Sequence, residues 1–63
     1  MTLGQQLRDI RKRKSITQKE LAKQVGISAN AMCNIEKGYS LPSIGTMNAI
    51  CEVLKVEFKL IEK

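Results

Sequence analysis

The amino-acid sequence predicts an all-α protein, a compact bundle of four helices followed by a short C-terminal β-strand. Three observations predict this fold class: apolar residues recur at helical spacing in four segments, each segment begins at a serine or threonine suited to capping, and two segments end at a glycine. The 63 residues suffice for one domain, spanning 1–63, and with one Phe, one Tyr and no Trp its core must be aliphatic. A domain this small buries only ~60% of the surface that its unfolded chain exposes, which favours helices with local contacts.

The first helix is expected over residues 2–14. Thr2 and Gln5 have the spacing of a capping box, and they precede an apolar stripe formed by Leu3, Leu7 and Ile10. The basic run at residues 11–14 comes at the end of this helix, where the helix dipole stabilises cations. Part of this basic cluster therefore has a structural explanation.

The second helix has the clearest beginning in the chain. Thr17 is placed as its N-cap, and Glu20 has the position that completes a capping box. Gly26 suits the left-handed conformation that ends a helix. The face expected to be buried consists of Leu21, Ala22 and Val25.

The third helix begins after Ser28 and ends at a second glycine, Gly38. Only Met32 and Ile35 form its apolar stripe, so most of this helix is free to face outward. Residues 17–38 therefore contain two short helices joined by a tight turn. A helix-turn-helix presents a recognition helix to the DNA major groove in this arrangement.

The fourth helix is expected over residues 43–54, with a core face formed by Met47, Ile50, Cys51 and Leu54. The tail then alternates apolar and charged residues, which indicates a strand at about 56–61. A single strand has no partner within a helical chain, so we expect it to pair with the same strand of a second subunit. The homodimer contacts would come from Val56, Phe58 and Leu60. A frayed terminus and a short fifth helix are the alternatives.

The net charge of +5 lies entirely in the first forty residues. They carry eight basic and three acidic side chains, whereas residues 41–63 carry three of each. A basic surface on the part of the chain that contains the two-helix motif indicates a polyphosphate partner, here double-stranded DNA. The alternative is an ordinary excess of lysine without a functional role.

Other classes of function find little support in the residue types. The chain has no His and no closely spaced pair of Cys, so we expect no metal site and no small-molecule cofactor. It has no nucleophile beside a base and no phosphate-cradling loop, which argues against an enzyme. No apolar run approaches membrane-spanning length and no signal peptide is present, so we expect a cytoplasmic protein without a membrane partner. Its two cysteines, Cys33 and Cys51, are then free thiols.

Three motifs follow one another along the chain: TQKELA at 17–22, VGIS at 25–28 and IEKG at 35–38. Together with Leu7, Arg11, Pro42 and the segment 54–56, they resemble the phage-repressor/Cro-like helix-turn-helix regulators, the XRE-type family. The resemblance runs from about Leu7 to Val56. It implies a λ-repressor-like bundle of four or five helices that binds operator DNA, usually as a two-fold dimer. The tail departs from the pattern, because many relatives have a capped fifth helix there, whereas some antitoxins of the family end in a strand that pairs across the dimer.

The resemblance also implies roles for individual residues. The positions from which relatives reach bases are Ser28, Ala29, Asn30 and Asn34. The positions that contact the DNA backbone are Gln18, Lys19, Lys37, Gly38, Tyr39 and Ser40. Gln18 would in addition brace the third helix. A structural salt bridge between the first and third helices would join Arg11 and Glu36. An asparagine amide can contact adenine with two hydrogen bonds, and an alanine methyl can touch a thymine methyl. The alternative for the asparagines and the tyrosine is a solvated surface without a DNA contact.

These observations predict a sequence-specific double-stranded DNA-binding transcriptional regulator. We expect a repressor that binds an inverted-repeat operator as a homodimer, with the third helix in the major groove. The alternative is the DNA-binding antitoxin of a toxin–antitoxin pair, for which the partner is a toxin protein and DNA binding is autoregulation. A toxin gene beside this one would favour that alternative.

Overall fold

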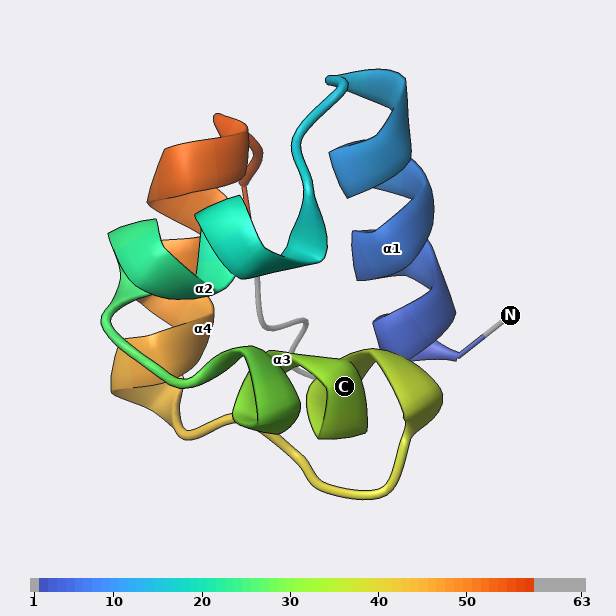
Figure 1. The fold of residues 1–63 in the computed structure, drawn as a ribbon, viewed down its shortest axis with the longest axis vertical. Coiled ribbons are helices and arrows are strands. Elements are labelled where there is room, and N and C mark those ends of the chain that lie inside the picture. Colours follow the sequence, from blue (N-terminus) through green and yellow to red (C-terminus); the bar gives the residue numbers. More distant parts are fainter. Residues whose placement is uncertain (1, 58–63) are drawn as a thin grey trace, which may run out of the picture.

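A computed structural model describes residues 2–57 as four helices joined by short loops (Figure 1). The helices are α1 (Leu3–Arg13), α2 (Gln18–Val25), α3 (Ala29–Lys37) and α4 (Ile44–Leu54). In the ribbon view α1 and α4 stand at opposite sides, and α3 lies across one end, beside the beginning of α1. The four-helix bundle that the sequence predicts is confirmed.

Local capping explains where the helices begin. Thr2 forms the predicted capping box with Gln5, because its Oγ1 accepts the Gln5 N–H at 3.2 Å while the Gln5 side chain accepts the Thr2 N–H at 3.0 Å. Serine side chains cap α3 and α4. Thr17 accepts the N–H of Glu20 at 3.1 Å, but the structure shows no return bond from the Glu20 side chain. Only half of the predicted second capping box is therefore formed.

Left-handed residues end three of the helices. Gly26 (φ 92°) ends α2 and Gly38 (φ 83°) ends α3, as the sequence predicts. Lys55 (φ 58°) ends α4 in the same conformation, which no glycine signals. The next N–H, that of Val56, donates to the carbonyl of Cys51 at 3.0 Å and closes the end of this helix.

The core is aliphatic, as the composition predicts, and all four helices contribute to it. Its buried members are Leu7, Leu21, Ala22, Met32, Ile35, Met47, Ile50, Cys51 and Leu54. Burial raises the pKa of the Cys51 thiol, because the thiolate would lose its solvation. The aliphatic core supports α2 and α3 from behind and leaves their outer faces to solvent.

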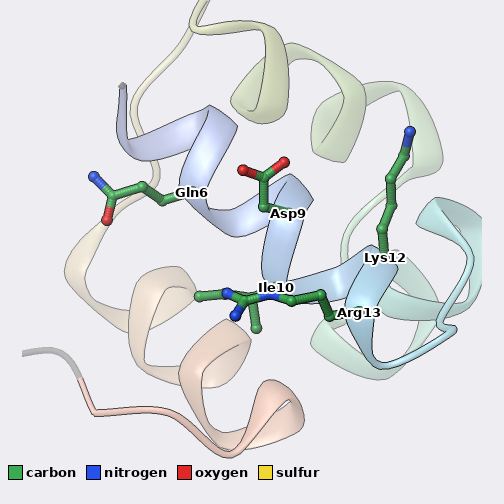
Figure 2. A pocket seen from close by; sticks show the side chains of 5 residues that line it. All are labelled: Gln6, Asp9, Ile10, Lys12 and Arg13. Atoms are coloured by element: carbon green, nitrogen blue, oxygen red, sulfur yellow. The ribbon is translucent and has the colours of Figure 1, made fainter.

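Helix α1 buries one face and exposes another. Leu7 and Arg11 are buried against the other helices. On the opposite face, Gln6, Asp9 and Arg13 are exposed and line a shallow surface depression of about 640 Å³ (Figure 2). Charged side chains near the end of α1 therefore lie both on its buried face, at Arg11, and on its exposed face, at Arg13.

The dimerisation strand expected at about 56–61 lies outside the described residues except for its first two positions, and Phe58 and Leu60 are outside them. Val56 is described, and it is not in a strand. Its half-buried side chain packs against the core of its own chain. The strand itself stays a prediction.

Candidate nucleic-acid interface

Helices α2 and α3 are joined by a tight turn at residues 26–28 (Figure 1). The N–H groups of Gly26 and Ile27 both donate to the carbonyl of Ala22, at 2.9 and 3.0 Å. Ala22 is almost fully buried, and its small side chain suits a close crossing of α2 by α3. The hydrogen bonds of the turn and the packing of Ala22 together fix the orientation of α3 relative to α2.

The outward face of α3 carries the residues that the sequence assigns to base contacts. Ala29 and Asn30 are exposed, and Asn34, one turn further along, is half-buried. Ser28 is exposed as well, and its Oγ accepts the N–H of Ala31 at 3.0 Å as the N-cap of the helix. A capping hydroxyl keeps its own proton as a donor, so Ser28 remains able to donate a hydrogen bond outward. The structure brings these four side chains together around the first turns of α3.

The last residue of α3 and the loop that follows it carry most of the residues assigned to DNA backbone contacts. Lys37, Gly38, Tyr39 and Ser40 are all exposed. The N–H of Tyr39 donates to the carbonyl of Asn34 at 2.9 Å, which turns the chain back over the end of the helix. The Lys37 Nζ lies 6.0 Å from the centroid of the Tyr39 ring, at the outer limit of a cation–π contact. Lys37 and the loop after it therefore present a cation, a phenol and backbone N–H groups at the end of α3.

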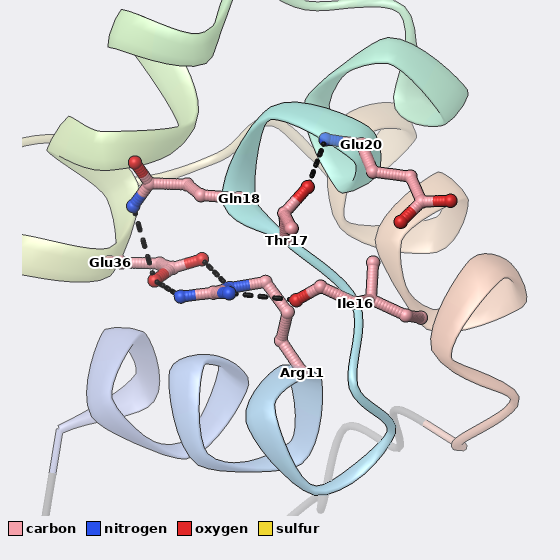
Figure 3. A network of polar contacts seen from close by, with 6 residues as sticks. All are labelled: Arg11, Ile16, Thr17, Gln18, Glu20 and Glu36. Atoms are coloured by element: carbon pink, nitrogen blue, oxygen red, sulfur yellow. Dashed lines mark hydrogen bonds and ion pairs between the residues drawn. The ribbon is translucent and has the colours of Figure 1, made fainter.

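A network of polar contacts connects the end of α3 to α1 and α2 (Figure 3). The Arg11 Nε donates to Glu36 Oε2 at 2.8 Å, and its Nη2 donates to Glu36 Oε1 at 3.1 Å. The remaining Arg11 nitrogen, Nη1, donates to the carbonyl of Ile16 at 2.8 Å. Gln18 Nε2 donates to Glu36 Oε1 at 3.3 Å. A single carboxylate therefore holds α1 through an arginine and the first residue of α2 through an amide.

The ion pair of Arg11 with Glu36 at the centre of this network is buried. The side chains of Arg11 and Glu36 are only 10% and 2% exposed. No buried side-chain nitrogen or oxygen of residues 2–57 lacks a hydrogen-bond partner. A satisfied polar network inside a protein is rigid, because breaking any one contact leaves a desolvated polar group. The end of α3 is consequently held at a defined place relative to α1 and α2.

Gly4 is a structural contact that sequence reasoning missed. It is buried on the face of α1 that meets α3, and a Cβ atom added there would lie 2.5 Å from the Ile35 carbonyl oxygen and 2.6 Å from that of Glu36. Only a glycine permits this approach of α1 to the last turn of α3. The sequence carried one signal for this contact: Gly4 lies within the apolar stripe of a predicted helix, and a glycine at such a position usually has a role in packing.

Other kinds of site find no support in the described residues. Between residues 2 and 57, no group of three His, Cys, Asp or Glu side chains is arranged to hold a metal ion. None of the helices in that range is long and apolar enough to cross a bilayer.

Comparison with known proteins places this geometry in a family. Residues 7–61 match the family model described as Helix-turn-helix. The immunity repressor protein of Bacillus phage phi105 is 33% identical over 61 residues, which cover 97% of this chain but 42% of the relative, so the chain spans less than half of that protein. The uncharacterised HTH-type transcriptional regulator YazB of Bacillus subtilis is 38% identical over 53 residues, covering 84% of this chain and 77% of YazB.

A solved structure has the same fold. The P22 c2 repressor protein, crystallised in complex with a synthetic operator, superposes with a TM-score of 0.87 at 28% sequence identity, covering 90% of this chain and 86% of the repressor chain. The stretch that matches the family model includes both helices of the two-helix motif, α2 and α3. The chain therefore belongs to the helix-turn-helix family of DNA-binding transcriptional regulators, in the XRE-type group that includes the phage repressors.

Proposed function

We propose that this protein represses transcription by binding an inverted-repeat operator in double-stranded DNA as a homodimer, with α3 in the major groove. The observation that carries the proposal is the exposed polar face around the first turns of α3, formed by Ser28, Ala29, Asn30 and Asn34, on a helix held in place at its other end. The similarity to a repressor that was solved on a synthetic operator supports it.

The mechanism would combine two kinds of contact. Lysine and arginine side chains, with the loop at residues 37–40, neutralise phosphates, and this contribution is independent of sequence and weakens as salt rises. Asn30 and Asn34 then read base edges, each good contact contributing about 1–3 kcal/mol of discrimination. Two subunits address half-sites about one helical turn apart, roughly 34 Å. Occupation of a promoter by this complex would exclude RNA polymerase.

A fluorescence-anisotropy titration near physiological salt tests the function. It compares DNA from upstream of this protein's own gene with a scrambled duplex of equal length. A preference of about 10³-fold or more for the upstream DNA is expected of an autoregulating operator-binding protein. Equal affinity for both would place the operator elsewhere, and no binding to any duplex would refute the function.

Asn30→Ala is expected to reduce the preference for the operator over scrambled DNA by roughly ten- to hundredfold, because the bidentate amide contact is lost. Affinity for the scrambled duplex should stay nearly unchanged, since phosphate contacts are intact. Asn48→Ala, the same change at an exposed position of α4, is the matched control. If both affinities of Asn30→Ala fall together, Asn30 does not read a base.

Removal of residues 58–63 is expected to convert the homodimer into a monomer, because the strand proposed to pair across the dimer is then lost. Val56, which packs against the core, remains in this variant, so the fold should be retained. Light scattering measures the mass, and circular dichroism verifies the helices. An unchanged dimer mass would rule out the strand interface and leave the dimer to another surface.

A further inference from the structure

A cleft of about 580 Å³ lies between α1 and the end of α3. One face of α1, the first residue of α2, the second half of α3 and the loop after it all contribute to the cleft. The lining residues that bear on its chemistry are Arg8, Arg11, Gln18, Glu36, Lys37 and Tyr39. Segments far apart in the sequence therefore meet at one concave surface beside the residues assigned to DNA backbone contacts.

The cleft has an excess of positive charge. Three cationic side chains and one carboxylate line it. Arg11 and Glu36 are buried and bonded to each other, so their charges largely cancel. Arg8 and Lys37 are exposed and supply the remaining positive charge. The positive charge available to an anion in the cleft therefore comes from two solvated cations, Arg8 and Lys37.

Neutral hydrogen-bond donors complete the lining. Gln18 gives one N–H to Glu36, but an amide nitrogen carries two, so the second remains to donate. Tyr39, a residue that is 77% exposed, adds a phenolic hydroxyl. Two cations beside neutral donors suit a phosphodiester, whose oxygens accept charge-assisted hydrogen bonds. Three of these residues, Gln18, Lys37 and Tyr39, belong to the predicted set of backbone contacts.

We propose that this cleft binds one phosphate of the DNA backbone and that Arg8 is a principal cationic contact in it. The inference rests on the proposed DNA-binding function and extends it, because neither the sequence motifs nor the base-contacting face of α3 assigned a role to Arg8. The contact is independent of base sequence. It also reaches the DNA from α1, so a helix outside the helix-turn-helix takes part in binding.

The decisive experiment compares Arg8→Met with Arg13→Met. Both changes remove one exposed arginine charge from α1 and keep a long side chain. Arg13 lies with Gln6, Asp9 and Ile10 around a different depression and does not line the α1–α3 cleft (Figure 2). The full chain is titrated with a labelled scrambled duplex over a range of salt concentrations, and thermal melts verify that both variants are folded.

Arg8→Met is expected to bind the scrambled duplex roughly tenfold more weakly, as for one lost charge-assisted hydrogen bond. The slope of log affinity against log salt should become shallower by about 0.9, which is one phosphate contact. Arg13→Met should lose less affinity at the same salt concentration, and Arg8→Lys should recover part of the loss. Equal affinities and slopes for Arg8→Met and Arg13→Met would overturn the proposal.

The rate of alkylation of the Cys33 thiol provides an independent test, because Cys33 also lines the cleft and is half-buried. Saturating duplex should slow alkylation of Cys33 in the wild-type protein. Cys51 serves as the internal reference, since it is buried in the core and its raised pKa disfavours the reactive thiolate. Alkylation of Cys33 at the same rate with and without bound DNA would also overturn the proposal.

Failure of this proposal is distinguishable from failure of the proposed function. If the wild-type protein binds neither the scrambled duplex nor the DNA upstream of its gene, DNA binding itself is refuted. If the wild-type protein binds DNA while Arg8→Met behaves like Arg13→Met, only the cleft is refuted.

Discussion

Glu36→Gln is expected to lower the free energy of unfolding by about 3–5 kcal/mol, the cost of breaking a buried ion pair by removing one partner. The Arg11 guanidinium would lose its carboxylate partner while its side chain is only 10% exposed. In the wild-type protein, both carboxylate oxygens of Glu36 accept hydrogen bonds from Arg11 Nε and Nη2. The amide of the variant would replace one of these acceptors with an N–H donor that faces another donor. Native domains are stable by about 5–15 kcal/mol in total, so this change removes a large share. Urea denaturation followed by circular dichroism measures it.

Glu20→Gln is the control for this change, because it makes the same substitution at an exposed position of α2. It should alter stability by less than about 0.5 kcal/mol. A double variant, Arg11→Met with Glu36→Leu, should recover much of the loss, since apolar replacement of both partners leaves no unpaired charge. A loss below about 1 kcal/mol for Glu36→Gln would show that the network contributes little to holding α3.

Gly4→Ala is expected to destabilise the fold by about 1–3 kcal/mol, the usual cost of overpacking. The added Cβ would lie 2.5 Å from the Ile35 carbonyl oxygen, and because that neighbour is backbone, α1 and α3 must move apart. Helix propensity alone predicts the opposite sign, a gain of about 0.5–1 kcal/mol for alanine over glycine within a helix. Thermal melts resolve the difference, since 1 kcal/mol shifts the Tm of a domain this size by about 4–8 °C.

Gly45→Ala is the matched control for Gly4→Ala. It makes the same change within α4, where an added Cβ would meet nothing within 4 Å. Its Tm should rise while that of Gly4→Ala falls. A rise in both variants would mean that the contact between α1 and α3 relaxes without cost, and Gly4 would then have no part in positioning α3.

The helices and their ends were largely predictable because their signals are local. The capping box of Thr2 with Gln5 and the left-handed Gly26 and Gly38 each depend on residues within about four positions of one another. The end of α4 after Leu54 also agrees with the expected range, although the left-handed residue there, Lys55, is not a glycine.

The candidate site was predictable only in part. The positions assigned to base contacts and the ion pair of Arg11 with Glu36 came from the family resemblance, since nothing local relates two residues that are 25 positions apart. The contact of Gln18 with α3 also follows from the resemblance, which implies that Gln18 braces the third helix, whereas the bond from Arg11 to the Ile16 carbonyl had no signal in the sequence. The role proposed for Arg8 had no signal in the sequence either, because only the folded chain shows that Arg8 lines a cleft with the end of α3.

The sequence by itself determined the all-α class, the limits of the four helices, the aliphatic core and the helix-turn-helix at residues 17–38, because helix periodicity and capping act over one or two turns. Only the tertiary structure decided how closely α1 approaches α3 at Gly4, how one carboxylate joins α1, α2 and α3, and which charged residues share a cleft. These features depend on distances between segments that the chain brings together only on folding. Packing of the whole core sets those distances, and no short stretch of sequence encodes them.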